Sequence, residues 1–358
     1  MARERVQWID AARGFALSLV VLMHACSLLA RSGFPVAEIL VPVNQVLDGL
    51  RMPTLLMISG LFAVAVREWS WSDVVRRRAG PLLWLYLLWG VINLVIVALL
   101  FGGGLAEDLV RDLMLLPLRP HIRTWYLFAL AVFVVLTWAL RRVPTSLVVP
   151  AAALISVCAY AVWPNPGPGG GWHWWLFLAQ HWVYFVCAER GAELYRAIAR
   201  RTTPVLASCA TAAFILVGTG FWSAGWLYGE GSGRSALPAL LVAVLGTLAS
   251  LTVFPVVADS RLLAWSRAIG RESLGVYVIH YWVLGAFVLV AARVLADAGV
   301  TGLGVVVPLV VTALALVTAF GMTLALKRWA PVPFLRPWWD MSEQKVERDK
   351  DGARAQAE

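Results

Sequence analysis

Residues 8–29 read W-I-D-A-A-R-G-F-A-L-S-L-V-V-L-M-H-A-C-S-L-L, a run long and apolar enough to cross a bilayer as a helix. The run carries three ionisable residues, Asp10, Arg13 and His24. A charged residue costs about 2.5–3.5 kcal/mol in a spanning helix, so such groups usually face a polar interior or a water-filled cavity. Arg13 and His24 are eleven residues apart, about three turns, which places both on one helix face roughly 16 Å apart along the axis. Asp10 is close enough to Arg13 to neutralise it. The run therefore predicts a functional helix face, or else a polar seam that joins helices.

The composition is that of an integral membrane protein. The chain of 358 residues is 60% hydrophobic and 14% charged, whereas soluble domains average about 45–50% apolar and 25% charged residues. The net charge of +9 does not indicate nucleic-acid binding, because the positive residues lie between apolar runs, where membrane topology explains them. The four cysteines show no paired spacing, and no histidine has metal-ligand spacing, so neither a disulfide framework nor a metal site is expected.

The apolar runs predict an all-α bundle of about ten transmembrane helices in a cell (plasma or inner) membrane. Spanning helices need about 17–25 residues, and their backbone must be satisfied internally, which excludes open sheets. The ten runs cover residues 8–29, 44–66, 81–101, 124–140, 147–163, 172–188, 204–222, 236–257, 273–295 and 302–326. The distribution of Lys and Arg predicts that both termini are cytoplasmic, with Arg51 counted among the outer positive residues. We expect one membrane domain over residues 1–340 and a charged, disordered cytoplasmic tail over 341–358.

Four further stretches carry polar groups. In L-R-M-P-T-L-L-M-I-S-G-L-F, residues 50–62, Ser59 can bond across helices and Gly60 permits close helix approach, so this stretch favours packing. The triplet Arg76–Arg77–Arg78 is either a topology signal or a set of guanidiniums for phosphates. T-W-Y-L occupies residues 124–127 at the start of an apolar run.

The last of the four stretches is I-G-R-E-S-L-G-V-Y-V-I-H, residues 269–280. In it, Ser273, Tyr277 and His280 recur at spacings of four and three, so they share one helix face and predict a lined cavity. His280 alone is more typical of a hydrogen-bonded structural group than of a proton carrier.

Taken in order, these stretches resemble the membrane acyltransferase-3 family, the O-acyltransferases that modify surface polysaccharides, glucans, lipids and some antibiotics. The resemblance covers roughly residues 5–330. The matching positions are Ile9-Asp10, Arg13-Gly14 and His24; Met52-Pro53 and Ser59-Gly60; Trp125-Tyr126-Leu127; and Gly270, Ser273, Leu274, Tyr277 and His280. One departure follows the second run: of the family's R-x-x-R-x-x-P, Arg78 and Pro81 are present but Val75 replaces the first arginine.

The resemblance implies a function and a site. It implies an acyl-CoA donor, most often acetyl-CoA, reached from the cytoplasm as a co-substrate, with no permanently bound cofactor. The acceptor would be a hydroxyl of an extracytoplasmic glycan or glycolipid. The key histidine and arginine of the family correspond to His24 and Arg13, with Asp10 beside them. His24 would act as general base or as nucleophile. Arg76, Arg77 and Arg78 would hold the donor's phosphates, and the cavity would be lined by Ser59, Trp125, Tyr126, Ser273, Tyr277 and His280.

Two other classes of protein fit the same residues. A secondary transporter of a small polar solute would also need about ten spans, intramembrane charge and a central cavity, although no internal repeat is evident. A binding component of an envelope pathway that has lost catalysis is the other class. The sequence leaves open whether the chain forms a homo-oligomer.

Overall fold

The computed structural model describes residues 6–101, 110–111, 113–118, 123–163, 173–227, 236–298 and 302–329. The described residues form helices and their connections, without a strand, which confirms the all-α prediction for this part of the chain. The chain divides into two compact units, one of Met1–Val64 with Val143–Thr323 and one of Ala65–Arg142 with Leu324–Glu358. The single domain expected over 1–340 stays a prediction, and the tail over 341–358 lies outside the described residues.

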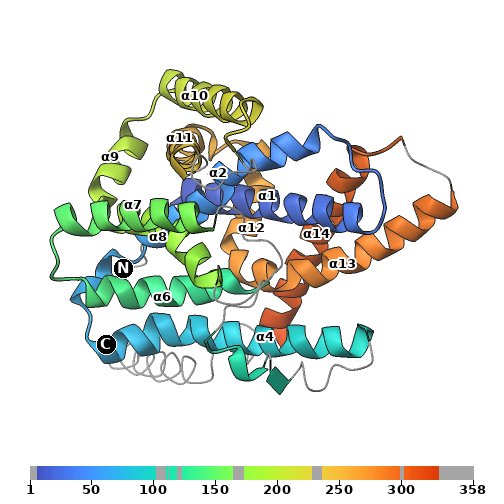
Figure 1. Ribbon diagram of the computed structural model, residues 1–358, viewed down its shortest axis with the longest axis horizontal. Helices are drawn as coiled ribbons and strands as arrows, with labels where there is room; N and C mark the ends of the chain where they lie inside the picture. The colour runs from blue at the N-terminus through green and yellow to red at the C-terminus, as the bar shows by residue number, and fades with distance from the viewer. Residues whose placement is uncertain are drawn as a thin grey trace, which may run out of the picture. The chain divides into compact units, whose positions relative to one another are not determined.

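The first unit holds most of the helices (Figure 1). They are α1 (Gln7–Arg31), α2 (Leu40–Leu61), α7 (Thr145–Val162), α8 (His173–Arg190), α9 (Ala192–Arg201), α10 (Pro204–Ser223), α11 (Ala236–Val257), α12 (Ala264–Arg271), α13 (Ser273–Asp297) and α14 (Val306–Trp329) as far as Thr323. The second unit holds α3 (Trp71–Val74), a π-helix (Val75–Ala79), α4 (Gly80–Phe101) and α6 (Trp125–Ala139). Two short 3₁₀ segments, Val64–Glu68 and Arg261–Leu263, complete the regular structure that is described.

A helix occupies each of the ten predicted runs, but only seven of the described helices are long and apolar enough to cross a membrane. The seven are Gln7–Arg31, Trp71–Ile96, Thr145–Val162, Pro204–Ser223, Ala236–Val257, Ser273–Leu295 and Val306–Trp329. Of the other three, α6 has 15 residues, and α2 and α8 contain charged residues such as Arg51 and Glu189. The count of about ten spans and the cytoplasmic termini therefore stay predictions.

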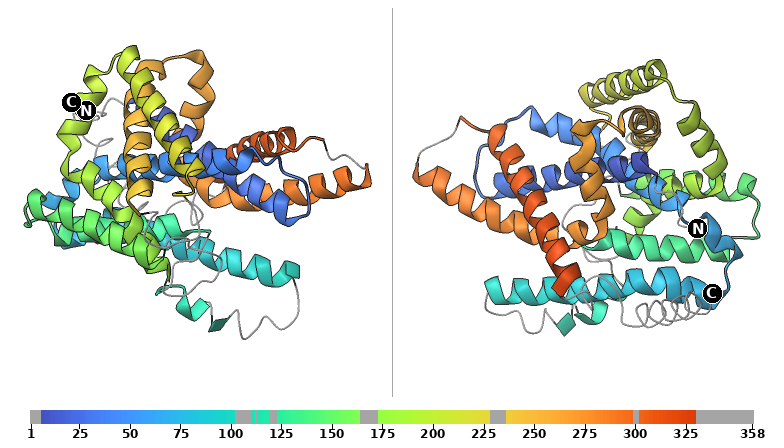
Figure 2. Two further views of the ribbon diagram at one scale, coloured as in Figure 1. Left: turned by 45° about the horizontal axis from the view of Figure 1, so that its top comes forward. Right: turned by 180° about the vertical axis from the view of Figure 1, so that it is seen from behind.

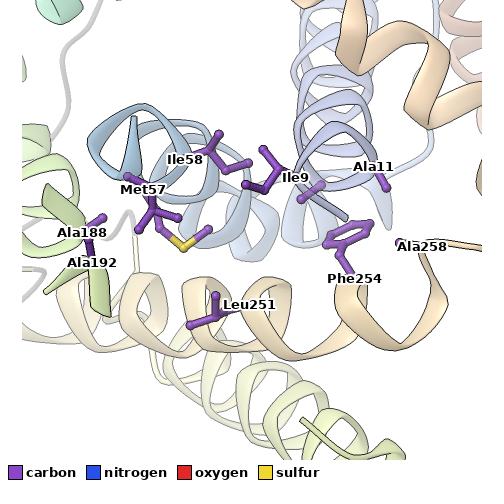
Figure 3. Close-up of a cluster of buried hydrophobic side chains, with 11 residues drawn as sticks. Ile9, Ala11, Met57, Ile58, Ala188, Ala192, Leu251, Phe254 and Ala258 are labelled. Atoms are coloured by element: carbon purple, nitrogen blue, oxygen red, sulfur yellow. The ribbon is translucent and has the colours of Figure 1, made fainter. Parts of the chain in front are cut away.

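A buried apolar cluster joins the start of α1 to α2, α8, α9 and α11 (Figure 3). Ile9 of α1 packs in it with Met57 of α2, Ala188 of α8 and Phe254 of α11. Between helices in a membrane, such van der Waals packing is a main source of association. The cluster therefore fixes the first turns of α1, which carry Asp10 and Arg13.

α1 also crosses α12 backbone to backbone. A Cβ atom on Gly14 would lie 1.8 Å from the carbonyl oxygen of Ser266, and one on Gly270 would lie 1.8 Å from that of Asp10. The Ser266 hydroxyl donates a hydrogen bond of 2.6 Å to the carbonyl oxygen of Ala11. Glycine is needed at both positions because any side chain would force the two backbones apart.

Candidate functional site

The first turns of α1 hold Asp10 and Arg13, the predicted ion pair, at a packed end of the first unit. Asp10 is buried, and the Arg13 side chain is half-buried with its guanidinium carbon 5.5 Å from the centre of the Phe62 ring. Such a stack of guanidinium on an aromatic face is a cation–π contact. The neutralisation of Arg13 by Asp10 stays a prediction.

His24, further along α1, faces α13. The centre of its half-buried ring lies 5.7 Å from that of His280 and 5.3 Å from that of Tyr281, which meets it edge-on. Figure 2 shows α13 running next to α1, in keeping with the packing of these two helices. Two histidines from the ends of the motif series are thus brought together, and we call His24 and His280 the histidine pair.

The motif residues of α13 lie on one continuous helix that begins at Ser273, as their spacing predicts. Tyr277 and Ser273 are half-buried, and the ring centres of Tyr277 and His280 are 5.8 Å apart. His280 is only 2% exposed. Its Nδ1 is 2.6 Å from the carbonyl oxygen of Tyr277, and no described residue gives its buried Nε2 a hydrogen-bond partner. Sequence reasoning missed Tyr281 because the motif ends at His280, although its spacing of four from Tyr277 places it on the same side of α13.

The second motif packs α2 against its neighbours. A Cβ atom on Gly60 would lie 2.2 Å from the carbonyl oxygen of Phe185, which confirms the close helix approach predicted for this glycine. Ser59 donates to the carbonyl oxygen of Leu55 within its own helix at 2.9 Å. Thr54 links α2 to α11 through a buried hydroxyl contact of 2.8 Å with Ser250. The place of Ser59 in a substrate cavity stays a prediction.

A polar row on α2 was not singled out from the sequence. Arg51, counted above with the outer positive residues, lies inside α2 and is only 4% exposed. It donates to Asp48 at 2.9 Å and to Asn44 at 3.4 Å. Spacings of four and three put Asn44, Asp48 and Arg51 on one helix face, and this was the signal available in the sequence. The Arg51 side chain is buried, whereas the Asp48 side chain that it binds is 40% exposed, so the pair forms a polar face on α2.

The arginine triplet lies in the second unit. Arg76, Arg77 and Arg78 are exposed and occupy the π-helix Val75–Ala79, a rare form that occurs often at functional sites. Nε of Arg77 is 2.9 Å from a carboxylate oxygen of Asp73. The triplet therefore presents its charge at the surface of its unit, as phosphate binding requires.

The predicted aromatic pair also lies in the second unit. Trp125 and Tyr126 begin α6, are half-buried, and have ring centres 6.1 Å apart at an angle of 81°. Their place in one cavity with the histidine pair stays a prediction. In the ranges that the structure describes, no group of three or more His, Cys, Asp or Glu side chains could hold a metal ion.

A comparison with known protein families found a match that covers nearly the whole chain. The family model described as an acyltransferase domain, acyltransferase 3, matches residues 6–326, nearly the whole chain. The match includes both members of the histidine pair, the arginine triplet and the glycines of the α1–α12 crossing. Neither a curated protein nor a solved structure matches the chain.

Proposed function

The chain belongs to the acyltransferase 3 family, and from that premise we propose that it transfers an acyl group from acyl-CoA to a hydroxyl of an extracytoplasmic acceptor. The seven apolar helices and the family together make it an integral membrane acyltransferase. Acetyl is the acyl group we propose, and a glycan or glycolipid the acceptor. The observation that carries the proposal is the approach of His24 of α1 to the rings of His280 and Tyr281 on α13.

His24 is proposed to act as general base. Its ring nitrogen takes the proton of the acceptor hydroxyl as the oxygen attacks the thioester carbonyl. The carbon–sulfur bond then breaks, and the proton passes from the imidazolium to the leaving thiolate, which gives the ester and free CoA. General base catalysis contributes about 10²–10⁴-fold, and alignment of the reactants adds to it.

A nucleophilic route uses the same residue. His24 would attack the thioester first and form an acyl-imidazole with release of CoA thiol, and the acceptor hydroxyl would then take the acyl group. Rapid mixing with labelled acetyl-CoA in the absence of acceptor separates the two routes, because only this one places label on the protein.

The donor side of the proposal uses arginines. Arg13 is fixed by the packed start of α1 and by its contact with Phe62, and it would orient the acyl-CoA. The exposed triplet of Arg76, Arg77 and Arg78 would hold the phosphates through charge-assisted hydrogen bonds. Ser59, Trp125 and Tyr126 would line the cavity together with the residues of α13.

The test uses the full chain in detergent with labelled acetyl-CoA and the methyl glycosides of glucose, galactose, mannose and rhamnose. We expect His24→Ala to lower the transfer rate at least 100-fold. The matched control is His173→Ala, which removes a histidine of the same unit that stacks on Trp163. Gel filtration and thermal unfolding show whether each variant is folded. Transfer by folded His24→Ala at the wild-type rate refutes the proposal. So does solute uptake by proteoliposomes without acyl-CoA, combined with no transfer.

A further inference from the structure

His280 has one ring nitrogen whose protonation state follows from its hydrogen bond. Nδ1 lies 2.6 Å from the carbonyl oxygen of Tyr277, and a carbonyl oxygen can only accept. Nδ1 therefore carries the proton, and in the neutral ring Nε2 is left with a lone pair. The tautomer is set by the helix backbone rather than by a neighbouring side chain.

That lone pair has no partner among the described residues, although the side chain is 2% exposed. Buried polar atoms are nearly always hydrogen-bonded, so each exception needs an explanation. Packing alone does not require an acceptor here, because an apolar side chain of similar size would fill the space without an unsatisfied atom. A hydrogen bond from a bound molecule would satisfy the atom.

The rings around His280 indicate which kind of donor could bind beside it. The ring of His280 is 5.7 Å from that of His24, with an angle of 32° between the planes, and 5.8 Å from that of Tyr277. The unpartnered nitrogen thus belongs to a ring beside the proposed base, among aromatic side chains that suit the apolar face of a sugar.

We propose that His280 positions the acceptor by accepting a hydrogen bond at Nε2 from a hydroxyl next to the one that reacts. This inference rests on the proposed function, since it takes His24 as the group that receives the proton of the reacting hydroxyl. Two neighbouring imidazoles can each engage one of two adjacent hydroxyls. The acceptor class that fits is therefore a vicinal diol, such as a pyranose ring, rather than an isolated alcohol.

The experiment compares His280→Leu, which removes the acceptor atom, with His280→Gln, whose side-chain oxygen can replace Nε2. The probe is the methyl glycoside that the wild type acetylates with the highest kcat/KM. We expect His280→Leu to raise the KM for this glycoside about 10- to 100-fold and to leave the KM for acetyl-CoA within about 2-fold. His280→Gln restores most of the affinity, and the control His173→Leu changes neither KM.

The deoxy forms of the same glycoside, each lacking one hydroxyl beside the acetylated position, complete the test. The wild type loses about 10-fold or more in kcat/KM on one of these forms, whereas His280→Leu loses little further, because the two changes remove the same hydrogen bond. Three results would overturn the role of His280 and leave His24 as the base. They are an equal rise of the two KM values in His280→Leu, no recovery of affinity in His280→Gln, and additive losses of kcat/KM in His280→Leu with the deoxy glycoside. Failure of His24→Ala to lower transfer, or no acetylated glycoside at all, overturns the proposed function itself.

Discussion

Gly14→Ala tests whether the α1–α12 crossing sets the geometry of the histidine pair. The added Cβ would lie 1.8 Å from the carbonyl oxygen of Ser266, whereas ordinary contact begins near 3.4 Å. The two helices must therefore separate by about 1.6 Å at this point. α12 ends at Arg271 and α13 begins at Ser273, so the displacement is passed to the helix that carries His280.

The expected loss is large for a single methyl group. Overpacking costs typically about 1–3 kcal/mol, and a misplacement of about 1 Å in a catalytic site can cost 10²-fold in rate. We expect Gly14→Ala to lower kcat/KM for acetyl transfer about 100-fold and to lower the midpoint of thermal unfolding in detergent. Both are measured on the purified chain, with labelled acetyl-CoA and with intrinsic tryptophan fluorescence.

Gly285→Ala is the matched control, because it lies in α13 and a Cβ there meets nothing within 4 Å. It should keep the wild-type rate and be slightly more stable, since alanine is favoured over glycine inside a helix by roughly 0.5–1 kcal/mol. Wild-type activity and stability in Gly14→Ala would refute the reasoning, because the crossing could then open without moving the site.

Two other predictions follow from single contacts. Thr54→Val removes the buried hydrogen bond to Ser250 and should destabilise the protein by about 0.6 kcal/mol. The double variant Thr54→Val with Ser250→Ala should lose little more stability, because both changes remove the same bond. Thermal unfolding of the two single variants and the double variant measures this, and fully additive losses would contradict it. Arg77→Ala should raise the KM for acetyl-CoA about 3- to 10-fold, and Asp73→Asn should lower it, because the carboxylate competes with phosphate for Arg77. Steady-state kinetics at low and high salt check both signs, and a rise in both variants would argue against phosphate binding there.

Local features of the fold were predictable, because they depend on composition over a single run. Each apolar run contains a helix, and the shared face of Ser273, Tyr277 and His280 follows from helix geometry. The count of spans was less secure, because α2 and α8 mix apolar and charged residues. Arg51 is an example. Counting positive residues places it outside the membrane, although its spacing of three from Asp48 allows the two side chains to pair and Arg51 to be buried in α2.

The contacts between helices were not predictable from one sequence. His24 and His280 are separated by 256 residues, and only the packing of α1 against α12 and α13 brings them together. The two motifs showed which face of each helix carries polar groups but not which faces meet. Likewise, Gly14 and Gly270 stood in separate motifs, and their common function appears only when the backbones are seen in contact.

The π-helix at Val75–Ala79 changes how the arginine motif should be counted. A π turn closes between residues five apart instead of four, so each residue advances through a smaller angle than in an α-helix. Three consecutive guanidiniums on such a turn therefore fan over a narrower arc than they would on an α-helix. Spacing along the chain is therefore a poor guide to spacing in space here, and the valine at position 75 need not leave a gap in the positive charge.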